Sequence, residues 1–246
     1  MNIDILIPLY VDHKDRLTNL KRILKILKEY GIESIHVREY YKETPQYNGE
    51  DCIYSSVKLE EDNFNKMRCV NEMVEDCKHD ALAIYDVDVI LFKGDIKQSI
   101  EMLKEGYDFV YPYNGQFFNI PKKHTDKFLV ERKIDLNDYE LANPNSYGGC
   151  VIFNREIFFE GGMCNPNFKN VGFDDNEIQL RFERLGYKMG RTQNPLLHLD
   201  HHRSETSVEK NYYLPHNSYI YDFIKTCPIE KLREEIKSWH AESKFI

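Results

Sequence analysis

Short apolar segments alternate with amphipathic segments along the first half of the chain, and this alternation is the strongest constraint on the fold. Residues 3–9, 34–37 and 81–85 are apolar runs of strand length. Between them, leucines within 17–27 and apolar residues within 64–78 recur at helical spacing. Strand–helix–strand order with apolar strands predicts an α/β fold with a mixed, mostly parallel sheet flanked by helices.

Later segments extend this pattern less regularly. The pattern predicts strands at 52–57 and 108–113, a strand entering a helix at 148–158, and helices near 95–105, 174–186 and 228–240. Residues 114–146 show no clear periodicity. We therefore expect one domain over residues 1–205 and a C-terminal helical extension, residues 206–246, packed on the same domain.

Composition excludes several classes of protein. A net charge of −8 over 246 residues argues against nucleic-acid binding, which requires a basic face. There is no apolar run of about 20 residues, and the first residues lack a signal peptide's basic region. The six cysteines form no CxxC pair, so we expect free thiols, no zinc site and a cytoplasmic protein. Peripheral association with the inner face of a membrane and the oligomeric state stay open.

Two aspartates, Asp86 and Asp88, come directly after the apolar run 81–85. Ligands bind at the carboxyl ends of strands in α/β sheets, and a buried carboxylate is costly unless it is paired or bound to a metal. Carboxylate oxygens suit Mg²⁺ or Mn²⁺, which in turn can hold a diphosphate. The alternative is a solvated turn that caps the following helix, but the position after a buried strand favours a metal site.

A histidine cluster follows late in the chain, in "NPLLHLDHHR". Its members are His198, His201 and His202. Imidazole binds Mn²⁺ as well as zinc, so one of these histidines is a candidate to complete a site begun by Asp88. The alternative is a surface loop whose histidines bind nothing.

Two predicted helices carry charged residues at their amino-terminal ends. Lys66 and Arg68 are candidate phosphate or nucleotide contacts, although the residues alone favour a solvated helix face. Asp174 and Asp175 precede a helix whose free N–H groups stabilise anions, so one is a candidate N-cap and the other a candidate general base. Two capping acids are the alternative.

These segments, in this order, resemble glycosyltransferases of the GT-A fold. The resemblance is to the β-1,4-galactosyltransferase family and its bacterial relatives, including chondroitin-polymerase-type domains. It rests on "IPLYVDHKDRL", "FNKMRCVN", "YDVDVIL", "SYGGCVIFNREIF", "VGFDDNEIQLRFERLG" and "HLDHHR", which span about residues 3 to 203. The resemblance implies a GT-A (Rossmann-like) sheet, a UDP-sugar donor and Mn²⁺ or Mg²⁺ as cofactor.

The resemblance also implies a metal site. Asp88 corresponds to the metal-binding second aspartate of the family's DVD motif, and Asp86 to the first, which lies toward the ribose or uracil. His198 and His201 have the spacing of the family's MxxH motif, which makes His201 the first choice of ligand. His202 follows closely, since a shift of one residue is easily missed.

Donor-binding residues are implied in the same way, with Lys66 at the place of the family's arginine in FNRA. The remaining donor contacts would be Pro8, Tyr10, Arg16, Arg68, Gly148 and Gly149, the last two matching paired glycines near the donor sugar. Asp174 and Asp175 match the acidic pair of the catalytic helix, with Asp175 at the general base. "VGF" replaces the family's Trp-Gly-Gly, so the wall of the donor or acceptor site must differ.

The implied function is metal-dependent, inverting transfer of a hexose from a UDP-sugar to a glycan acceptor. Related retaining enzymes carry asparagine where this chain has Asp175, which favours inversion. Galactose, N-acetylgalactosamine and glucose remain possible donors, and bacterial surface polysaccharide synthesis is the expected setting. A sugar-phosphate nucleotidyltransferase and a catalytically silent nucleotide- or sugar-binding protein are the alternatives.

Overall fold

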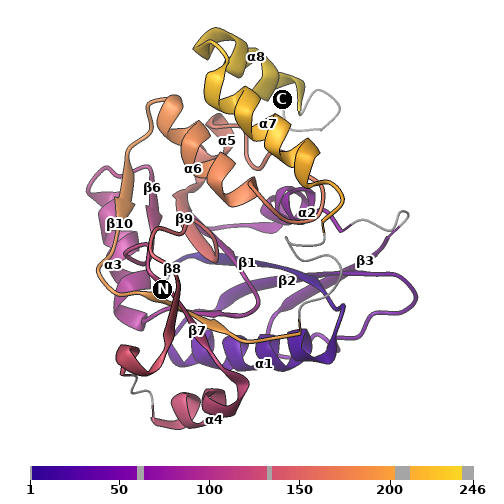
Figure 1. The fold of residues 1–246 in the computed structure, drawn as a ribbon, viewed down its shortest axis with the longest axis vertical. Helices are drawn as coiled ribbons and strands as arrows, with labels where there is room; N and C mark the ends of the chain where they lie inside the picture. The colour runs from indigo at the N-terminus through magenta and orange to yellow at the C-terminus, as the bar shows by residue number, and fades with distance from the viewer. Residues whose placement is uncertain (1, 60–63, 132–134, 203–210, 240–246) are drawn as a thin grey trace.

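A seven-stranded sheet forms the centre of the computed structural model, which describes residues 2–59, 64–131, 135–202 and 211–239 (Figure 1). Its strand order is β10-β6-β9-β4-β1-β2-β3. The strands are β1 (Asp4–Tyr10), β2 (Ser34–Tyr41), β3 (Ile53–Lys58), β4 (Ala81–Tyr85), β6 (Phe109–Tyr111), β9 (Cys150–Asn154) and β10 (Met189–Arg191). Only β9 runs antiparallel to its sheet neighbours β4 and β6. The predicted α/β class and the mostly parallel sheet are confirmed, and this architecture is consistent with a GT-A fold.

Helices cover both faces of this sheet, which explains why its central strands are buried and almost entirely apolar. Helix α1 (Lys14–Glu29) lies on one face and α2 (Lys66–Met73) on the other (Figure 1). Every residue of β4 and all but the last of β1 are buried. Helix α1 ends before Gly31, whose φ of +78° is a conformation that glycine adopts without strain. Helix α3 (Lys93–Lys104) completes the predicted set of this half.

A second, four-stranded sheet is the main feature that the sequence did not predict. Its order is β5-β11-β7-β8. The strands are β5 (Val89–Ile90), β7 (Phe117–Ile120), β8 (Glu140–Asn143) and β11 (Leu196–Leu199). Helix α4 (Lys122–Glu131) and a 3₁₀ turn lie between β7 and β8, inside the segment without clear periodicity. In this sheet β11 pairs with β5, directly after Asp88.

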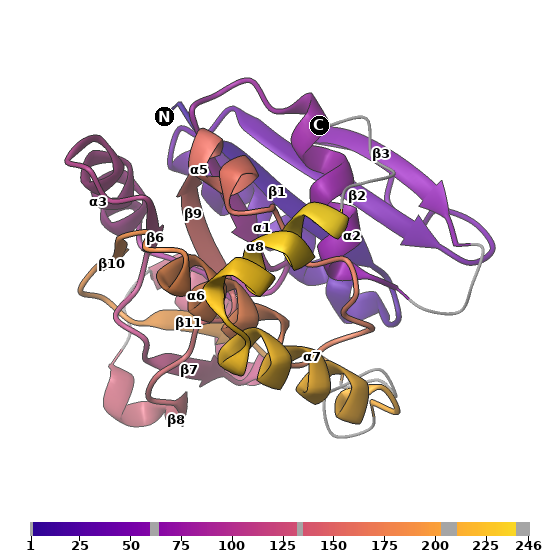
Figure 2. The same cartoon turned by 90° about the horizontal axis from the view of Figure 1, so that it is seen from above.

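The C-terminal part of the chain is helical and packs on the same side as α2 (Figure 2). Its helices are α5 (Arg155–Glu160), α6 (Asp174–Arg184), α7 (Leu214–Thr226) and α8 (Ile229–Ser238). Arg184 of α6 donates hydrogen bonds to the carbonyls of Ile224 and Cys227, and so ties α6 to the α7–α8 junction. Helix α8 agrees with the predicted helix near 228–240, whereas α7 was not predicted. The division at residues 205 and 206 stays a prediction, since it falls outside the described residues.

All six cysteines are free, as predicted. Within the described ranges, no helix is both long and apolar enough to cross a bilayer.

Candidate active site

A cavity of about 590 Å³ opens at the carboxyl ends of β1 and β4. Twelve of the fourteen residues expected at the site line it: Pro8, Tyr10, Arg16, Lys66, Asp86, Asp88, Gly148, Gly149, Asp174, Asp175, His198 and His201. These residues come from six segments that are far apart in the sequence. The fold therefore brings the residues of these separate motifs together around one cavity at the carboxyl ends of the strands.

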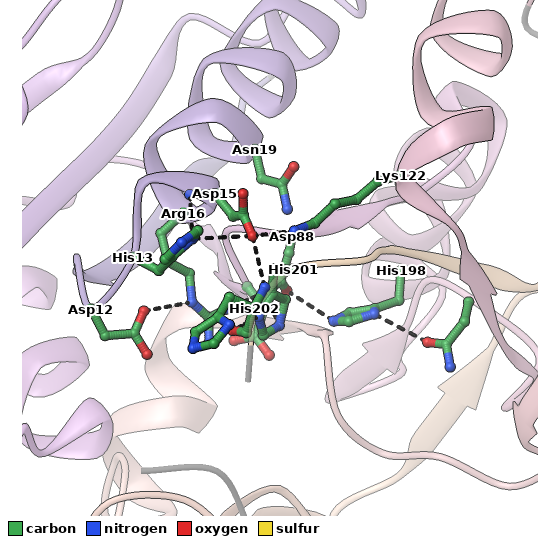
Figure 3. Close-up of polar contacts among 12 residues, drawn as sticks. Asp12, His13, Asp15, Arg16, Asn19, Asp88, Lys122, His198, His201 and His202 are labelled. Atoms are coloured by element: carbon green, nitrogen blue, oxygen red, sulfur yellow. Dashed lines mark hydrogen bonds and ion pairs between the residues drawn. The ribbon is translucent and has the colours of Figure 1, made fainter. Parts of the chain in front are cut away.

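The carboxylate of Asp88 faces the imidazole rings of His198 and His201 (Figure 3). Its carboxylate is 5% exposed, with Oδ2 3.1 Å from His201 Nε2 and Oδ1 3.6 Å from His198 Nε2. The three ligand-type atoms lie within 4.8 Å of one another. Strand pairing produces this arrangement, because β11 carries His198 alongside β5, and the N–H of Leu199 donates to the Asp88 carbonyl over 2.7 Å.

The far ring nitrogen of each histidine is also engaged, which fixes how the rings face Asp88. His201 Nδ1–H donates to the His202 carbonyl over 2.8 Å, and His198 Nδ1 is 3.2 Å from Asn119 Oδ1. Outer hydrogen bonds of this kind set the tautomer of metal-ligating histidines. One carboxylate and two Nε2 atoms thus form a donor set that fits Mn²⁺.

Electrostatics keep Asp88 ionised. Burial alone would raise its pKa, but His198, Arg16 and His201 outweigh burial and hold the pKa well below its usual range. Burial lowers the pKa of His198. For His201, burial also acts downward, but the hydrogen bond to Asp88 raises its pKa above the ordinary value. Arg16 also contacts Asp88 Oδ2 directly, so a protein cation stands beside this carboxylate.

Asp15 holds the histidine segment in place. Its Oδ2 accepts the backbone N–H of His202 over 2.8 Å and pairs with Lys122 Nζ (Figure 3). Although burial raises the pKa of Asp15, the hydrogen bond from Lys122 lowers it to about 2. Asp15 could not be predicted as a site residue, because nothing in the local pattern distinguishes it from a solvated helix acid.

A second charged group, Lys66 with Asp86 and Asp175, lies on the same cavity. Lys66 Nζ is 2.7 Å from Asp86 Oδ1 and 3.4 Å from Asp175 Oδ1. The Lys66 side chain is only 12% exposed. Burial lowers its pKa, but the attraction of Asp175 and Asp86 outweighs burial, so Lys66 stays charged. The alternative of a solvated helix face is therefore wrong for Lys66.

Asp175 has the acid–base character of a proton acceptor. Burial, assisted by the negative charges of Asp174 and Asp86, raises its pKa to about 7 against the opposing attraction of Lys66. About 30% of its side chain is exposed to the cavity. A carboxylate with a pKa near the working pH and access to a cavity suits general base catalysis.

The start of helix α6 corrects the expected capping roles. The N-cap position is Phe173, which provides no capping side chain, and Asp174 and Asp175 are the first two helical residues. Asp174 Oδ1 accepts the N–H of Gly172 over 3.0 Å, whereas Asp175 turns to Lys66. Phe173 has a φ of +66°, a strained value for a bulky side chain. Such strain concentrates at functional sites.

Gly148 and Gly149 lie where the side chain of any other residue would collide with a neighbouring side chain. A Cβ on Gly148 would lie 2.8 Å from Asp175 Oδ2, and one on Gly149 would lie 2.6 Å from Leu196 Cδ1. Gly149 also has a φ of +94°. Both glycines therefore allow the loop to approach the acidic residues and β11 closely.

Arg191 on β10 supports this loop and was not predicted from the sequence. Its guanidinium donates to the Ser146 carbonyl over 2.9 Å and lies 4.7 Å from the ring centre of Tyr147. The hydroxyl of Tyr113 donates to the Gly148 carbonyl over 2.6 Å. No sequence signal could have found Arg191, since it sits in a three-residue strand without a motif.

Aromatic side chains form the remaining wall. Tyr10 stacks on Phe64 with ring centres 5.6 Å apart and an angle of 15° between the planes. Phe117 packs against His198 at 5.1 Å. Phe64 adjoins the "NKM" stretch in the sequence, but its pairing with Tyr10 could not be deduced from that position.

Two expected site residues lie elsewhere. Arg68 is exposed on α2 and pairs with Glu72, so it fits the solvated helix face. His202 is exposed, and its ring lies 4.7 Å from the ring of His13 (Figure 3). Its backbone carbonyl orients His201 by accepting a hydrogen bond, whereas its imidazole does not face Asp88.

The fold and the cavity thus define an α/β protein with a candidate metal centre beside a lysine–carboxylate group. No family model and no curated protein sequence matches the chain. Among solved structures, the chain is similar to the catalytic domain of Drosophila β1,4-galactosyltransferase 7 in complex with xylobiose. The two are 17% identical with a TM-score of 0.46, and the match covers 77% of this chain and 63% of the Drosophila chain. This chain is also similar to an aspartate-to-asparagine mutant of the Drosophila enzyme in complex with manganese, UDP-Gal and xylobiose, with 16% identity, a TM-score of 0.46, and coverage of 78% and 65%. The chain therefore spans less than two thirds of these structures.

Proposed function

We propose that this protein is a metal-dependent, inverting glycosyltransferase that moves a hexose from a UDP-sugar to a hydroxyl group of a glycan acceptor. One observation carries the proposal. A single cavity is lined by an Asp–His–His donor set around the buried Asp88 and by a carboxylate, Asp175, whose pKa is raised to about 7. The first suits the leaving diphosphate and the second suits the attacking hydroxyl.

Asp88, His198 and His201 would hold the metal. The two imidazoles favour Mn²⁺ over Mg²⁺, because Mg²⁺ prefers oxygen ligands. When bound there, the metal would neutralise negative charge that develops on the departing UDP. Arg16 contacts Asp88 directly and would share in that neutralisation.

The donor would lie between the aromatic pair and the glycine loop. Tyr10 and Phe64 provide an apolar face for the uracil, and Asp86 provides a hydrogen-bond acceptor for the nucleoside. Lys66 is a buried cation at the position where a diphosphate would pass. Gly148 and Gly149 would let the donor sugar approach the backbone.

Asp175 would accept the proton of the acceptor hydroxyl as that oxygen attacks the anomeric carbon. General base catalysis of this kind contributes about 10²–10⁴-fold to a rate. Asp174 would position the helix start through its bond to the N–H of Gly172. Attack from the face opposite the diphosphate would convert an α-linked UDP-hexose into a β-linked product.

The resemblance to β-1,4-galactosyltransferases keeps galactose, N-acetylgalactosamine and glucose as the candidate sugars. It also keeps bacterial surface polysaccharide synthesis, in the cytoplasm and at the inner face of the membrane, as the proposed setting.

A UDP-release screen over UDP-sugars and glycan acceptors, with Mn²⁺ or Mg²⁺, tests the proposal. We expect release that requires both acceptor and metal, stops with EDTA and yields a β-linked product by NMR. An α-linked product would contradict inversion. Absence of release with every donor, or formation of pyrophosphate from UTP and a sugar phosphate, would contradict the glycosyltransferase function.

A further inference from the structure

Three side chains of metal-ligand type, Asp4, His36 and Cys77, converge at the amino ends of the central strands, opposite the cavity, and His79 contacts the group through Asp4. Asp4 begins β1, His36 lies on β2, and Cys77 and His79 precede β4. The ligand-type atoms of Asp4, His36 and Cys77 lie within 4.8 Å of one another, and these three residues are at most 5% exposed. None of the four takes part in the proposed transfer reaction.

The distances among these atoms suit a tetrahedral ion. Asp4 Oδ1 is 3.3 Å from His36 Nε2 and 3.1 Å from His79 Nδ1. Zinc bonds of about 2.0–2.3 Å imply ligand atoms about 3.3–3.7 Å apart at the corners of a tetrahedron. These two separations are close to that range, and Cys77 Sγ lies within 4.8 Å of the Asp4 and His36 ligand atoms, so Cys77 and His79 would move toward the ion to complete the geometry.

Outer contacts already orient the carboxylate. Asp4 Oδ2 accepts the backbone N–H groups of Lys78 and His79 over 2.8 and 2.7 Å, which turns Oδ1 toward the histidines. Ser34 Oγ donates to Oδ1 and lies 3.0 Å from His36 Nε2. Partners of this type are the usual outer shell of a metal site.

Charge and access also suit a divalent ion. One carboxylate and one thiolate would balance a 2+ charge, while both imidazoles stay neutral. His79 is 32% exposed and lines a separate cavity of about 580 Å³, which gives an ion a route from solvent. The thiolate makes this donor set softer than that of Asp88, so it selects zinc rather than Mn²⁺ or Mg²⁺.

We propose that Asp4, His36, Cys77 and His79 form a structural zinc site that ties together the beginnings of β1, β2 and β4. Binding would release the thiol proton of Cys77 to solvent, leaving a Cys77 Sγ–zinc bond. Sequence spacing concealed this site, since only Cys77 and His79 are neighbours along the chain.

Cobalt(II) substitution tests the proposal directly, because a thiolate ligand produces a charge-transfer absorption that oxygen and nitrogen ligands do not. The full chain would be stripped of metal and titrated with Co²⁺, in a His201→Gln background that weakens the Asp88 site. We expect the thiolate absorption at one Co²⁺ per chain and a rise in Tm on addition of Zn²⁺. Cys77→Ser should abolish the absorption, whereas Cys52→Ser, a matched cysteine away from the cluster, should retain it.

Two further variants test the same site if Cys77→Ser does not fold. His36→Asn should remove the Zn²⁺-dependent rise in Tm. Ser34→Ala should leave the absorption in place and lower Zn²⁺ affinity about 10- to 100-fold. Absence of thiolate absorption at saturating Co²⁺ would overturn the site and show a hydrogen-bonded network only. Absorption that persists in Cys77→Ser would overturn it by showing that another cysteine binds the ion. Neither result depends on the UDP-release screen, so the two proposals can fail separately.

Discussion

Two buried aspartates, Asp4 and Asp88, lie at opposite ends of the central strands of the same sheet, and the carboxylate of each faces two histidines. The backbone saturates one oxygen of Asp4, which accepts two main-chain N–H groups. Both oxygens of Asp88 instead face side chains that line a cavity, namely Arg16, His198 and His201. An aspartate anchored by the main chain holds the fold together, whereas one held by side chains beside a cavity can exchange its partners for a ligand.

This contrast predicts that carboxylates of the cavity edge matter for activity and that Asp4 matters for stability. The largest effect is expected for Asp175→Asn. Asparagine keeps the size of the side chain but cannot accept the proton, so kcat should fall about 10²–10⁴-fold while UDP affinity stays near wild type and Tm does not fall. Glu183→Gln, the same change at an exposed position of α6, is the control and should not alter kcat. Near-wild-type turnover by Asp175→Asn would remove Asp175 from the mechanism.

Asp4→Asn tests the other edge in metal-free protein. The carboxylate is fully buried and meets His36, His79, Ser34 and two main-chain N–H groups, so an amide would leave several of these partners unsatisfied. Breaking a buried ionic group of this kind costs about 3–5 kcal/mol of unfolding free energy. Asp126→Asn breaks a surface pair with Arg22 and should cost about 1 kcal/mol or less in urea unfolding. Equal effects of the two changes would contradict the structural role of Asp4.

Gly149→Ala addresses the loop between the glycine pair and β11. The positive φ of Gly149 and the approach of Leu196 oppose any side chain, so we expect a loss of about 1–3 kcal/mol in denaturant unfolding. Gly94→Ala on α3 is the control, since a Cβ there meets nothing within 4 Å. That change should be neutral or stabilise by about 0.5–1 kcal/mol. A stable, active Gly149→Ala enzyme would show that the close approach is not required.

The last effect concerns the pH dependence of stability. With a folded-state pKa of about 7, Asp175 keeps a proton in the folded chain that the unfolded chain releases near its ordinary pKa of about 4. Its contribution to stability is therefore present at low pH and is lost as pH rises from about 4 to about 7. We expect the Tm of the metal-free wild type, relative to that of Asp175→Asn, to fall over this range. A constant difference would place the pKa of Asp175 near its ordinary value.

Local patterns carried much of the fold and part of the site. Apolar runs and helical spacing predicted β1, α1, β4 and α6, because these elements bury a continuous face. Strands β7 and β8 escaped prediction because each has only four residues: β7 is too short for its alternation of burial to stand out, and β8 is exposed throughout. Pairing of β11 with β5 was also hidden, because contacts between distant segments leave no periodic trace.

The same limit applies to individual site residues. Asp88 could be singled out because a carboxylate after a buried strand is costly without a partner. The MxxH spacing placed His198 and His201 ahead of His202, but which rings face Asp88 depends on the path of the chain at and after β11, which leaves no local pattern. Arg68 was expected at the site only by its place in a motif, and its exposure shows that the helix turns it away.

The central claim is that the Asp88 edge forms a metal-dependent UDP-sugar site. Isothermal calorimetry of UDP binding to metal-stripped protein, with and without Mn²⁺, tests it most directly, with Asp88→Asn and Asp126→Asn measured alongside. We predict that UDP binds when Mn²⁺ is present, that EDTA removes the binding, and that Asp88→Asn alone abolishes the effect of Mn²⁺. UDP affinity that is the same with Mn²⁺ and with EDTA, or that is unchanged in Asp88→Asn, would contradict the claim.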